Sequence, residues 1–458
     1  MCVRAISKDR PSSFFVRFLS NHDGATYCLA MGIRIISVAA CVAVAVAGCS
    51  SPPSSTTAES PTATATSVQP NAALRPIDPA AFKAVVEAAA EKLFVPGAMV
   101  LVRTPQGTYD AGVGTTELGA QTPPTAATHF RIASNTKTMT AALIVLLAQD
   151  GKLKFEDPVS NYVPGVPNGD NITVADLLKM RSGLYGYTGD PALADALDAD
   201  FGKPWTPQEV LAIAFRHPPQ FAPDASYEYS NTNYALLGLI AEKVGGQPLA
   251  QQLQSRLFAP LAMAQTSLPA ANDTSLPAPY SHGYMYGKTL YALADDPYPA
   301  EMQAAIRAGT EKPIDYTHQN SSYATAAGGV ISTADNLATW MKALVSGKVF
   351  DADYQQHWFA SLQDEDPDAP DGQKYGYGIS YQRYGPKAQM YYHGGELPGF
   401  NSFMGYDPEN DVALVIWTNL TLSPDAKTTA NAMLPTILDE IYAGLSLAPT
   451  PAAPTTTR

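Results

Sequence analysis

Residues 130–153 read FRIASNTKTMTAALIVLLAQDGKL, and this stretch decides how the rest of the chain is interpreted. Its apolar residues recur at helical spacing, and Gly151 is a plausible end of the helix. Ser134 and Lys137 stand three residues apart where the helix is expected to begin, ahead of the apolar run. Residues three apart lie on one face of a helix. The pattern therefore predicts a buried helix that presents a hydroxyl and an amine together at its start.

This pair of side chains has the chemistry of acyl transfer. A serine hydroxyl becomes a good nucleophile when a neighbouring base takes its proton. Burial and the positive end of a helix both favour the neutral form of a lysine, so Lys137 could be that base for Ser134. Backbone N–H groups at a helix start could stabilise an oxyanion. Ser-x-x-Lys occurs once, as chance alone would give, so an N-capping serine beside a solvated lysine stays open.

Two further motifs carry candidate site residues. Tyr229-Ser-Asn231 precedes another apolar helix; a phenol can pass on a proton if nearby cations lower its pKa, and an amide can hold a substrate carbonyl or amide. His393-Gly394-Gly395 leads into a C-terminal hairpin, where glycine permits close approach of a substrate and histidine can donate a hydrogen bond or carry charge. The plainer alternatives are a core tyrosine with an N-capping asparagine, and a satisfied loop histidine.

The order of the expected elements indicates the fold class. A helix is expected to start at Asp78, followed by a hairpin that turns at 105–107. A second hairpin is expected over 401–419 and a last helix over about 425–444, with mostly helical segments between 134 and 345. Strands at both ends with helices between them predict an α+β fold: one antiparallel sheet closed by the two chain ends, flanked by helices, with an inserted mostly helical subdomain.

Residues 1–48 are expected to lie outside this fold. The apolar run at 35–47 follows a basic residue and fits a secretory signal peptide, and the ending VAGC resembles a bacterial lipobox in which Cys49 becomes lipidated. An uncleaved apolar anchor is the alternative. Met31 is a better start than Met1, so the preceding residues are expected to be an over-extended start or to be removed with the signal.

The remaining chain divides by composition. Residues 49–76 are rich in Ser, Thr, Pro and Ala and are expected to form a disordered tether, residues 77–445 to form the folded domain, and residues 446–458 to form a disordered tail. All four cysteines lie at or before Cys49, so the folded domain has no disulfide to rely on. The expected location is the outer face of the cell membrane or the cell envelope, with a lipid anchor.

The order of the three motifs is more specific than any one of them. With Ser-x-x-Lys, Tyr-x-Asn and His-x-Gly in this order, the chain resembles the serine β-lactamase and penicillin-binding superfamily, in particular the branch of class C β-lactamases, D-Ala-D-Ala carboxypeptidases and family VIII esterases. The resemblance runs from about residue 78 to 444 and includes ITVADLLKMRSGL (172–184) and AAGGVISTADNLATWMKAL (326–344). It implies a β-lactamase/transpeptidase-like fold and a serine hydrolase domain over 77–445.

The resemblance also implies catalytic roles. Ser134 would be the acylated nucleophile and Lys137 its general base. Tyr229 would pass the proton to the leaving group and help deacylation. The backbone N–H groups of Ser134 and Glu396 would form the oxyanion hole.

Four residues would bind the substrate: Asn231, His393, Gly394 and Gly395. Asn231 would hold the acyl side chain, and His393 would stand where many relatives carry the Lys of Lys-Thr-Gly. Gly394 replaces the Thr that helps relatives grip a substrate carboxylate, and Glu396 is an anion where Ser or Thr is common. Both changes weaken recognition of a β-lactam or D-Ala carboxylate, unless a remote Arg or Lys supplies the lost contact.

The expected function is therefore an exported, lipid-anchored serine hydrolase that acts through an acyl-enzyme on Ser134, with esterase or amidase activity. A D-alanyl-D-alanine carboxypeptidase or β-lactamase of the cell envelope is the alternative. An alternative of another class is a non-catalytic, cell-wall-binding lipoprotein. The expected substrate is a small ester, amide or peptidoglycan-derived molecule, while the oligomeric state is unknown.

Composition excludes several other classes. The net charge of −13 argues against a nucleic-acid partner. The chain contains no Gly-x-Ser-x-Gly, His-x-His or His-Glu-x-x-His, so an α/β-hydrolase and a catalytic zinc are not expected, and no cofactor is expected. The acidic run at 363–372 lacks the spacing of an EF-hand calcium loop and is interpreted as a solvated loop.

Overall fold

The computed structural model describes residues 72–294, 297–369 and 372–447. The expected signal peptide, the lipidation site Cys49 and most of the expected tether and tail lie outside these residues. Among the helices that are described, none has both the length and the apolarity needed to cross a bilayer.

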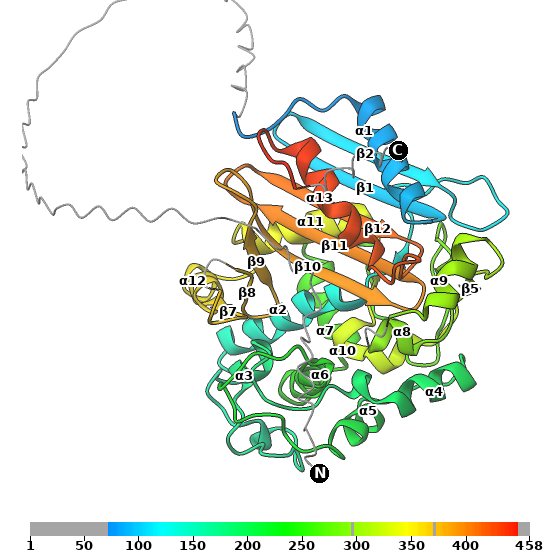
Figure 1. Cartoon of the computed structure of the whole chain (residues 1–458). Helices are drawn as coiled ribbons and strands as arrows, with labels where there is room; N and C mark the ends of the chain where they lie inside the picture. The colour runs from blue at the N-terminus through cyan, green and yellow to red at the C-terminus, as the bar shows by residue number, and fades with distance from the viewer. Residues whose placement is uncertain (1–71, 295–296, 370–371, 448–458) are drawn as a thin grey trace, which may run out of the picture. The chain divides into compact units, whose positions relative to one another are not determined.

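An eight-stranded antiparallel sheet forms the centre of the domain (Figure 1), in the order β2-β1-β12-β11-β10-β9-β8-β7. The N-terminal hairpin joins the C-terminal one at β1 and β12, where Ala98 lies opposite Thr418. The expected α+β fold, with an antiparallel sheet closed by the two chain ends, is confirmed. The strands are β1 (Gly97–Thr104), β2 (Gly107–Gly114), β7 (Gln363–Asp364), β8 (Lys374–Tyr375), β9 (Ser380–Arg383), β10 (Gln389–Leu397), β11 (Phe400–Asp407) and β12 (Val412–Thr418).

Both faces of the sheet are covered, which explains the nearly continuous apolar runs in its strands. In β1, Val100 and Val102 pack into one hydrophobic core and Met99 and Leu101 into the other, because successive side chains point to opposite faces. Figure 1 shows α1 (Pro79–Lys92) and α13 (Thr429–Ile441) on one face and α2 (Thr136–Gln149) with α11 (Ala334–Val345) on the opposite face. The helix α1 begins where expected, since the side chain of Asp78 accepts a hydrogen bond from the backbone N–H of Ala81.

The region between the two hairpins is mostly helical, as predicted, and packs around α2. Thirteen of the fourteen residues of α2 are buried, so the helix is surrounded by protein on all sides. Two short strand pairs, β3 (Phe130–Arg131) with β6 (Ile331–Ser332) and β4 (Tyr284–Met285) with β5 (Ile314–Asp315), tie the segment together. The remaining helices are α3 (Val174–Leu178), α4 (Pro191–Ala199), α5 (Pro207–Ala214), α6 (Asn231–Gly245), α7 (Leu249–Leu253), α8 (Leu290–Leu293), α9 (Ala300–Arg307), α10 (Thr325–Gly328) and α12 (Ala352–Ala360).

Two expected boundaries need correction. The tether was expected to reach residue 76, but Leu74 forms a bridge with Tyr442, and the backbone N–H of Arg75 donates to the carbonyl of Ile441. The acidic run at 363–372 was expected to be a solvated loop, but its first two residues form β7 and pair with β8. A strand of two residues is too short to show an alternating pattern, so the sequence did not reveal it.

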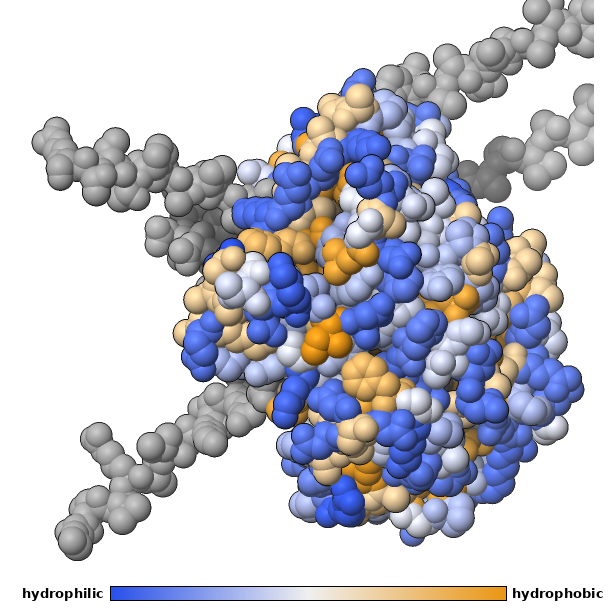
Figure 2. Space-filling view, turned by 90° about the vertical axis from the view of Figure 1, so that its right-hand side faces the viewer, coloured by the Kyte–Doolittle hydropathy of each residue, from blue (hydrophilic) through white to orange (hydrophobic). Residues whose placement is uncertain are grey.

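On the face shown in Figure 2, hydrophilic residues are mixed with small, separate apolar areas. The large hydrophobic residues that are exposed in the described part of the chain are Phe94, Leu118 and Ile314. They come from three different segments, which is ordinary for a protein surface.

Candidate active site

Ser134 lies in a tight turn between β3 and α2 rather than on the helix itself. The turn is the 3₁₀ segment Ala133–Asn135, and Ala133 takes a left-handed conformation with φ of 50°. Asn135 holds the turn in place: its side-chain amide donates to the carbonyl of Ile132 at 2.9 Å and to Ser402 Oγ in β11 at 2.8 Å. Ser134 is the one residue between positions 130 and 140 that is not fully buried, so its hydroxyl can meet a substrate.

Lys137 is fully buried one turn after Ser134. Its Nζ lies 2.9 Å from Ser134 Oγ, 2.7 Å from Asn231 Oδ1 and 2.8 Å from the carbonyl oxygen of Ala327. Desolvation by burial lowers the pKa of Lys137 well below its ordinary value, which favours the neutral amine that a general base needs. The expected direction of this shift is confirmed.

The neutral amine has two N–H donors and one lone pair, and its three neighbours are complementary to them. Asn231 Oδ1 and the Ala327 carbonyl can only accept, so they take the two N–H groups. The remaining neighbour, the hydroxyl of Ser134, can donate its hydrogen to the lone pair. This arrangement points the basic electron pair of Lys137 at the proton that must leave Ser134.

Tyr229 lies just before α6 and reaches the same point. Its hydroxyl is hydrogen-bonded to Ser134, and the Nζ of Lys137 lies 4.8 Å from its ring centroid. Part of the residue reaches the surface, yet burial of the phenol raises the pKa of Tyr229 well above its ordinary value, although the bond to Ser134 opposes this. The condition stated for proton transfer, that nearby cations lower this pKa, is not met, because desolvation outweighs the other causes. The phenol is therefore protonated and can donate a proton.

Asn231 is the first residue of α6, and both ends of its amide are used. Its Oδ1 accepts from Lys137, and its Nδ2 donates to Thr188 Oγ1 at 3.0 Å. The amide thus orients the lysine as well as lining the hollow beside Ser134. Thr188 was not predicted from the sequence, because no motif marks it.

His393 lies inside β10, whereas its motif was expected to precede the C-terminal hairpin, and it is fully buried. Its Nδ1 lies 2.6 Å from the carbonyl of Gly394 and so must carry the hydrogen, while Nε2 lies 3.2 Å from the hydroxyl of Tyr375 and accepts from it. Desolvation by complete burial lowers the pKa of His393 to about 3. The residue was expected to donate to substrate or carry charge; the structure instead gives an uncharged, internally bonded histidine, with Tyr375 as an unpredicted partner.

The glycine that follows the histidine motif brings β10 against the nucleophile turn. A Cβ atom on Gly395 would lie 2.3 Å from the carbonyl oxygen of Ile132 and 2.6 Å from Ser402 Oγ. No side chain fits there, so Gly395 permits the close approach of the strand to Ser134.

Two small hollows of about 20 and 10 Å³ flank Ser134, and Glu396 lines both of them. Their volumes are each close to that of one water molecule. The larger is bounded by Asn231, Thr188, Tyr323 and, from α8, Leu293. The smaller contains Tyr229, together with Gly394, Gly395, Asn401 and Asn431. All the predicted site residues within the described chain, except Lys137 and His393, therefore line the space around Ser134.

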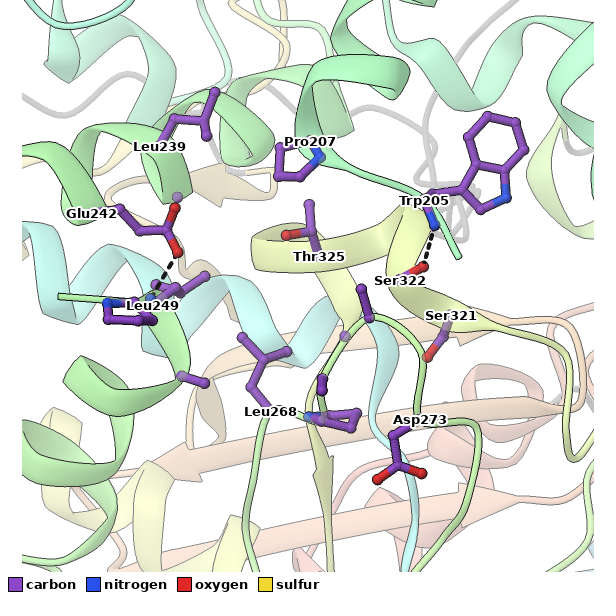
Figure 3. A pocket seen from close by; sticks show the side chains of 17 residues that line it. Trp205, Pro207, Leu239, Glu242, Leu249, Leu268, Asp273, Ser321, Ser322 and Thr325 are labelled. Carbon is purple, nitrogen blue, oxygen red and sulfur yellow. Dashed lines mark hydrogen bonds between the residues drawn. The ribbon is translucent and has the colours of Figure 1, made fainter. Parts of the chain in front are cut away.

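A much larger hollow of about 310 Å³ lies on the other side of α10 (Figure 3). Thr325 and Gly329 contribute to its wall, whereas Ala327 of the same short segment faces the catalytic side and accepts from Lys137. Leu239, Glu242 and Leu249 line it as well. None of the predicted site residues lines this hollow, so the volume of a hollow alone does not identify the active site.

Comparison with known proteins places this geometry in context. Protein flp of Staphylococcus aureus (strain MW2) is 26% identical over 334 residues, which is 71% of this chain and 60% of that protein. The chain thus spans about 60% of the length of this relative. A protein of Bacillus subtilis (strain 168) that is named "Putative penicillin-binding protein PbpX" is 24% identical over 326 residues, which is 71% of this chain and 70% of that protein.

Among solved structures, a D-stereospecific amidohydrolase from Streptomyces sp. superposes with a TM-score of 0.65 at 28% identity, covering 78% of this chain and 98% of the other. The match confirms the fold expected from the three motifs. The sequence model of the Beta-lactamase family matches residues 82–436, well over half of the chain, and the chain belongs to this family.

Proposed function

We propose that this protein is a serine hydrolase that forms an acyl-enzyme on Ser134 and acts on small esters or amides. The observation that carries the proposal is the 2.9 Å contact between Lys137 Nζ and Ser134 Oγ, with both other neighbours of the amine being hydrogen-bond acceptors. A non-catalytic binding protein has no use for a buried, neutral lysine at a serine hydroxyl, and burying an amine without charge is costly for folding.

In the proposed reaction, Lys137 accepts the hydroxyl proton while Ser134 Oγ attacks the substrate carbonyl. The backbone N–H groups of Ser134 and Glu396 hold the oxyanion. The proton on Lys137 then passes through the phenol of Tyr229, which receives it on the oxygen as it donates its own hydrogen to the leaving group. The C–O or C–N bond breaks, and water attacks the acyl-enzyme by the same steps in reverse.

An amidase or esterase is favoured over a carboxypeptidase or β-lactamase by the charges around Ser134. Burial favours the neutral forms of Lys137 and His393, and Glu396 adds a carboxylate, so the site disfavours a substrate carboxylate. The structural neighbour named as a D-stereospecific amidohydrolase supports the same choice. The name of the Bacillus subtilis relative supports penicillin binding, which keeps D-alanyl-D-alanine carboxypeptidase as the second candidate.

We also propose that the protein is exported and anchored by a lipid on Cys49, on the strength of the apolar run and the VAGC ending alone. Replacing Cys49 by Ala should release the protein from the membrane fraction of its host and abolish incorporation of labelled palmitate. Retention of the label in the variant would refute the lipid site.

The activity is tested on the full chain with a p-nitrophenyl ester and, separately, a fluorescent penicillin, with Ser134→Ala as the control. We expect ester turnover that disappears in the variant, with little penicillin labelling. Stable labelling of Ser134 by penicillin would indicate a carboxypeptidase, and rapid penicillin hydrolysis a β-lactamase. Turnover that survives in Ser134→Ala would refute the assigned nucleophile.

A further inference from the structure

We propose that the physiological substrate carries a positively charged amino group next to the scissile carbonyl, and that the side-chain carboxylate of Glu396 binds this group. The inference rests on the proposed acyl-enzyme function and adds to it the chemical class of the acyl group: an α-amino acyl ester or amide rather than a simple fatty acyl or carboxylate-bearing one.

The position of Glu396 is the first support. It is the next residue after Gly395, whose lack of a side chain brings β10 against the turn that carries Ser134. Glu396 is 9% exposed and lines both hollows that flank Ser134. Its backbone N–H is the proposed second donor to the oxyanion, so its side chain starts beside the carbonyl carbon of the substrate. An α-amino group is attached one carbon further on and comes within reach of that side chain.

The charges around the hollows are the second support. Among the described residues that line either hollow, none is a lysine or an arginine. Burial favours the neutral form of Lys137, just behind them, and lowers the pKa of His393 to about 3. The charged side chain that lines the hollows is therefore the carboxylate of Glu396, in a poorly solvated space where opposite charges attract strongly and like charges repel. Arg131, a cation whose charge also acts on Tyr323, lies outside the lining of both hollows. An ammonium group gains from the field of Glu396 and a carboxylate loses.

The hydroxyl of Tyr323 is the third support. Tyr323 lines the larger hollow together with Glu396, and its buried hydroxyl has no hydrogen-bond partner among the described residues. Burial raises the pKa of Tyr323, and the negative charge of Glu396 is among the further causes, which places the two groups within electrostatic range. An ammonium group has three N–H donors, and the carboxylate and the phenol oxygen both accept such hydrogen bonds.

The test compares two substrates that differ in the amino group alone: alanine p-nitroanilide, as both enantiomers, and propionic acid p-nitroanilide. The full chain is measured as wild type, Glu396→Gln and Glu396→Asp. We expect the wild type to favour the amino substrate in kcat/KM, and Glu396→Gln to reduce the ratio of the two kcat/KM values by about 10- to 100-fold, the size of a lost charged hydrogen bond. Glu396→Asp keeps the charge and should keep most of the preference.

A pH profile gives an independent readout on the wild type, which matters if the variants fold poorly. The preference for the amino substrate should fall above about pH 8, where an α-amino group loses its charge. An unchanged substrate ratio in Glu396→Gln, or a preference that does not respond to pH, would overturn the inference while leaving the hydrolase intact. If an acylating fluorophosphonate also failed to label Ser134 in the wild type, the proposed function itself would fall and the inference with it.

Discussion

Lys137 Nζ and Ser134 Oγ lie 2.9 Å apart, and the lysine is held there by two acceptors from distant parts of the chain, Asn231 Oδ1 and the carbonyl of Ala327. The acceptors fix both N–H groups of a neutral amine, so its lone pair has one direction left, toward the serine hydroxyl. The same burial that favours the neutral amine costs folding free energy, since a lysine pKa that is lower in the folded chain than in the unfolded chain means that proton binding favours unfolding. The site is thus organised for function at some expense of stability.

Replacing Lys137 by Met tests the base directly, because Met has a similar length and no lone pair able to take the proton at this position. We expect the rate of Ser134 acylation to fall by about 10²- to 10⁴-fold, the usual contribution of a general base. Labelling of Ser134 by a fluorophosphonate measures this step without turnover. The melting temperature shows whether the fold survives; a folded variant that is labelled at the wild-type rate would refute the role of Lys137.

Replacing Tyr229 by Phe keeps the ring beside Lys137 and removes the hydroxyl that donates to the leaving group. An amide leaves only when its nitrogen is protonated, whereas p-nitrophenolate leaves readily as an anion. We therefore expect the variant to lose about 10²- to 10³-fold in kcat on an alkyl amide and much less on a p-nitrophenyl ester. The two substrates are measured side by side on the same protein sample. Equal losses on both would show that Tyr229 acts before departure of the leaving group.

The local part of this site could be predicted from the sequence. Ser134 and Lys137 stand one turn apart, so their contact follows from helical geometry and needs no knowledge of the rest of the fold. The same holds for the cap at Asp78 and for the hairpins, whose turns are encoded within a few residues. The closure of the sheet by both chain ends was also predicted, because a hairpin at each end leaves edge strands that can pair with each other.

The contacts between distant parts of the chain could not be predicted from the sequence. The acceptor carbonyl of Ala327 is 190 residues from Lys137 and belongs to the backbone, which carries no sequence signal. Thr188 and Tyr375 become partners of the site only through tertiary packing. His393 is neutral because it is completely buried. The two glycines that follow it in the sequence do not indicate whether the histidine is buried or exposed. These features set the pKa values of the site, so the sequence identified the reacting groups better than it identified their charge.

Leu293 of α8 limits the larger hollow beside Ser134, which is too small in this conformation to hold an acyl chain. Replacing it by Ala should enlarge the hollow and shift the preference toward longer acyl groups. We expect the ratio of kcat/KM for a hexanoyl over an acetyl p-nitrophenyl ester to rise by about 10-fold, which corresponds to about two newly buried methylenes at roughly 0.8 kcal/mol each.

The matched control for this prediction is Leu249→Ala, which truncates a similarly buried leucine in the hollow of Figure 3, on the other side of α10. Both variants should lose about 2–5 kcal/mol of unfolding free energy. Only Leu293→Ala should change the acyl-chain ratio. A comparable change in the control would mean that loosened packing, rather than the volume next to Ser134, determines the preference.

Glu365, the residue that follows β7, predicts a pH-dependent stability. Burial raises the pKa of Glu365 from 4.5 to about 7, although hydrogen bonds from Gln373 and Tyr227 and the charge of Arg181 oppose this. Between these two values the folded chain binds a proton that the unfolded chain has lost. The contribution of this group to the free energy of unfolding is therefore fully present below pH 4.5 and decreases as the pH rises to 7.

Glu365→Gln removes this titration. The free energy of unfolding of the variant minus that of the wild type should therefore be larger at pH 8 than at pH 5, by about 1–3 kcal/mol once partial exposure of the side chain is allowed for. Urea unfolding at the two pH values measures the difference, and Glu87→Gln on the exposed face of α1 serves as the control for a surface glutamate. Because Glu365 also helps to raise the pKa of Tyr229, its ionisation acts on the active site too. An identical stability change at pH 5 and pH 8 would show that the carboxyl is ionised throughout, as in an ordinary solvated loop.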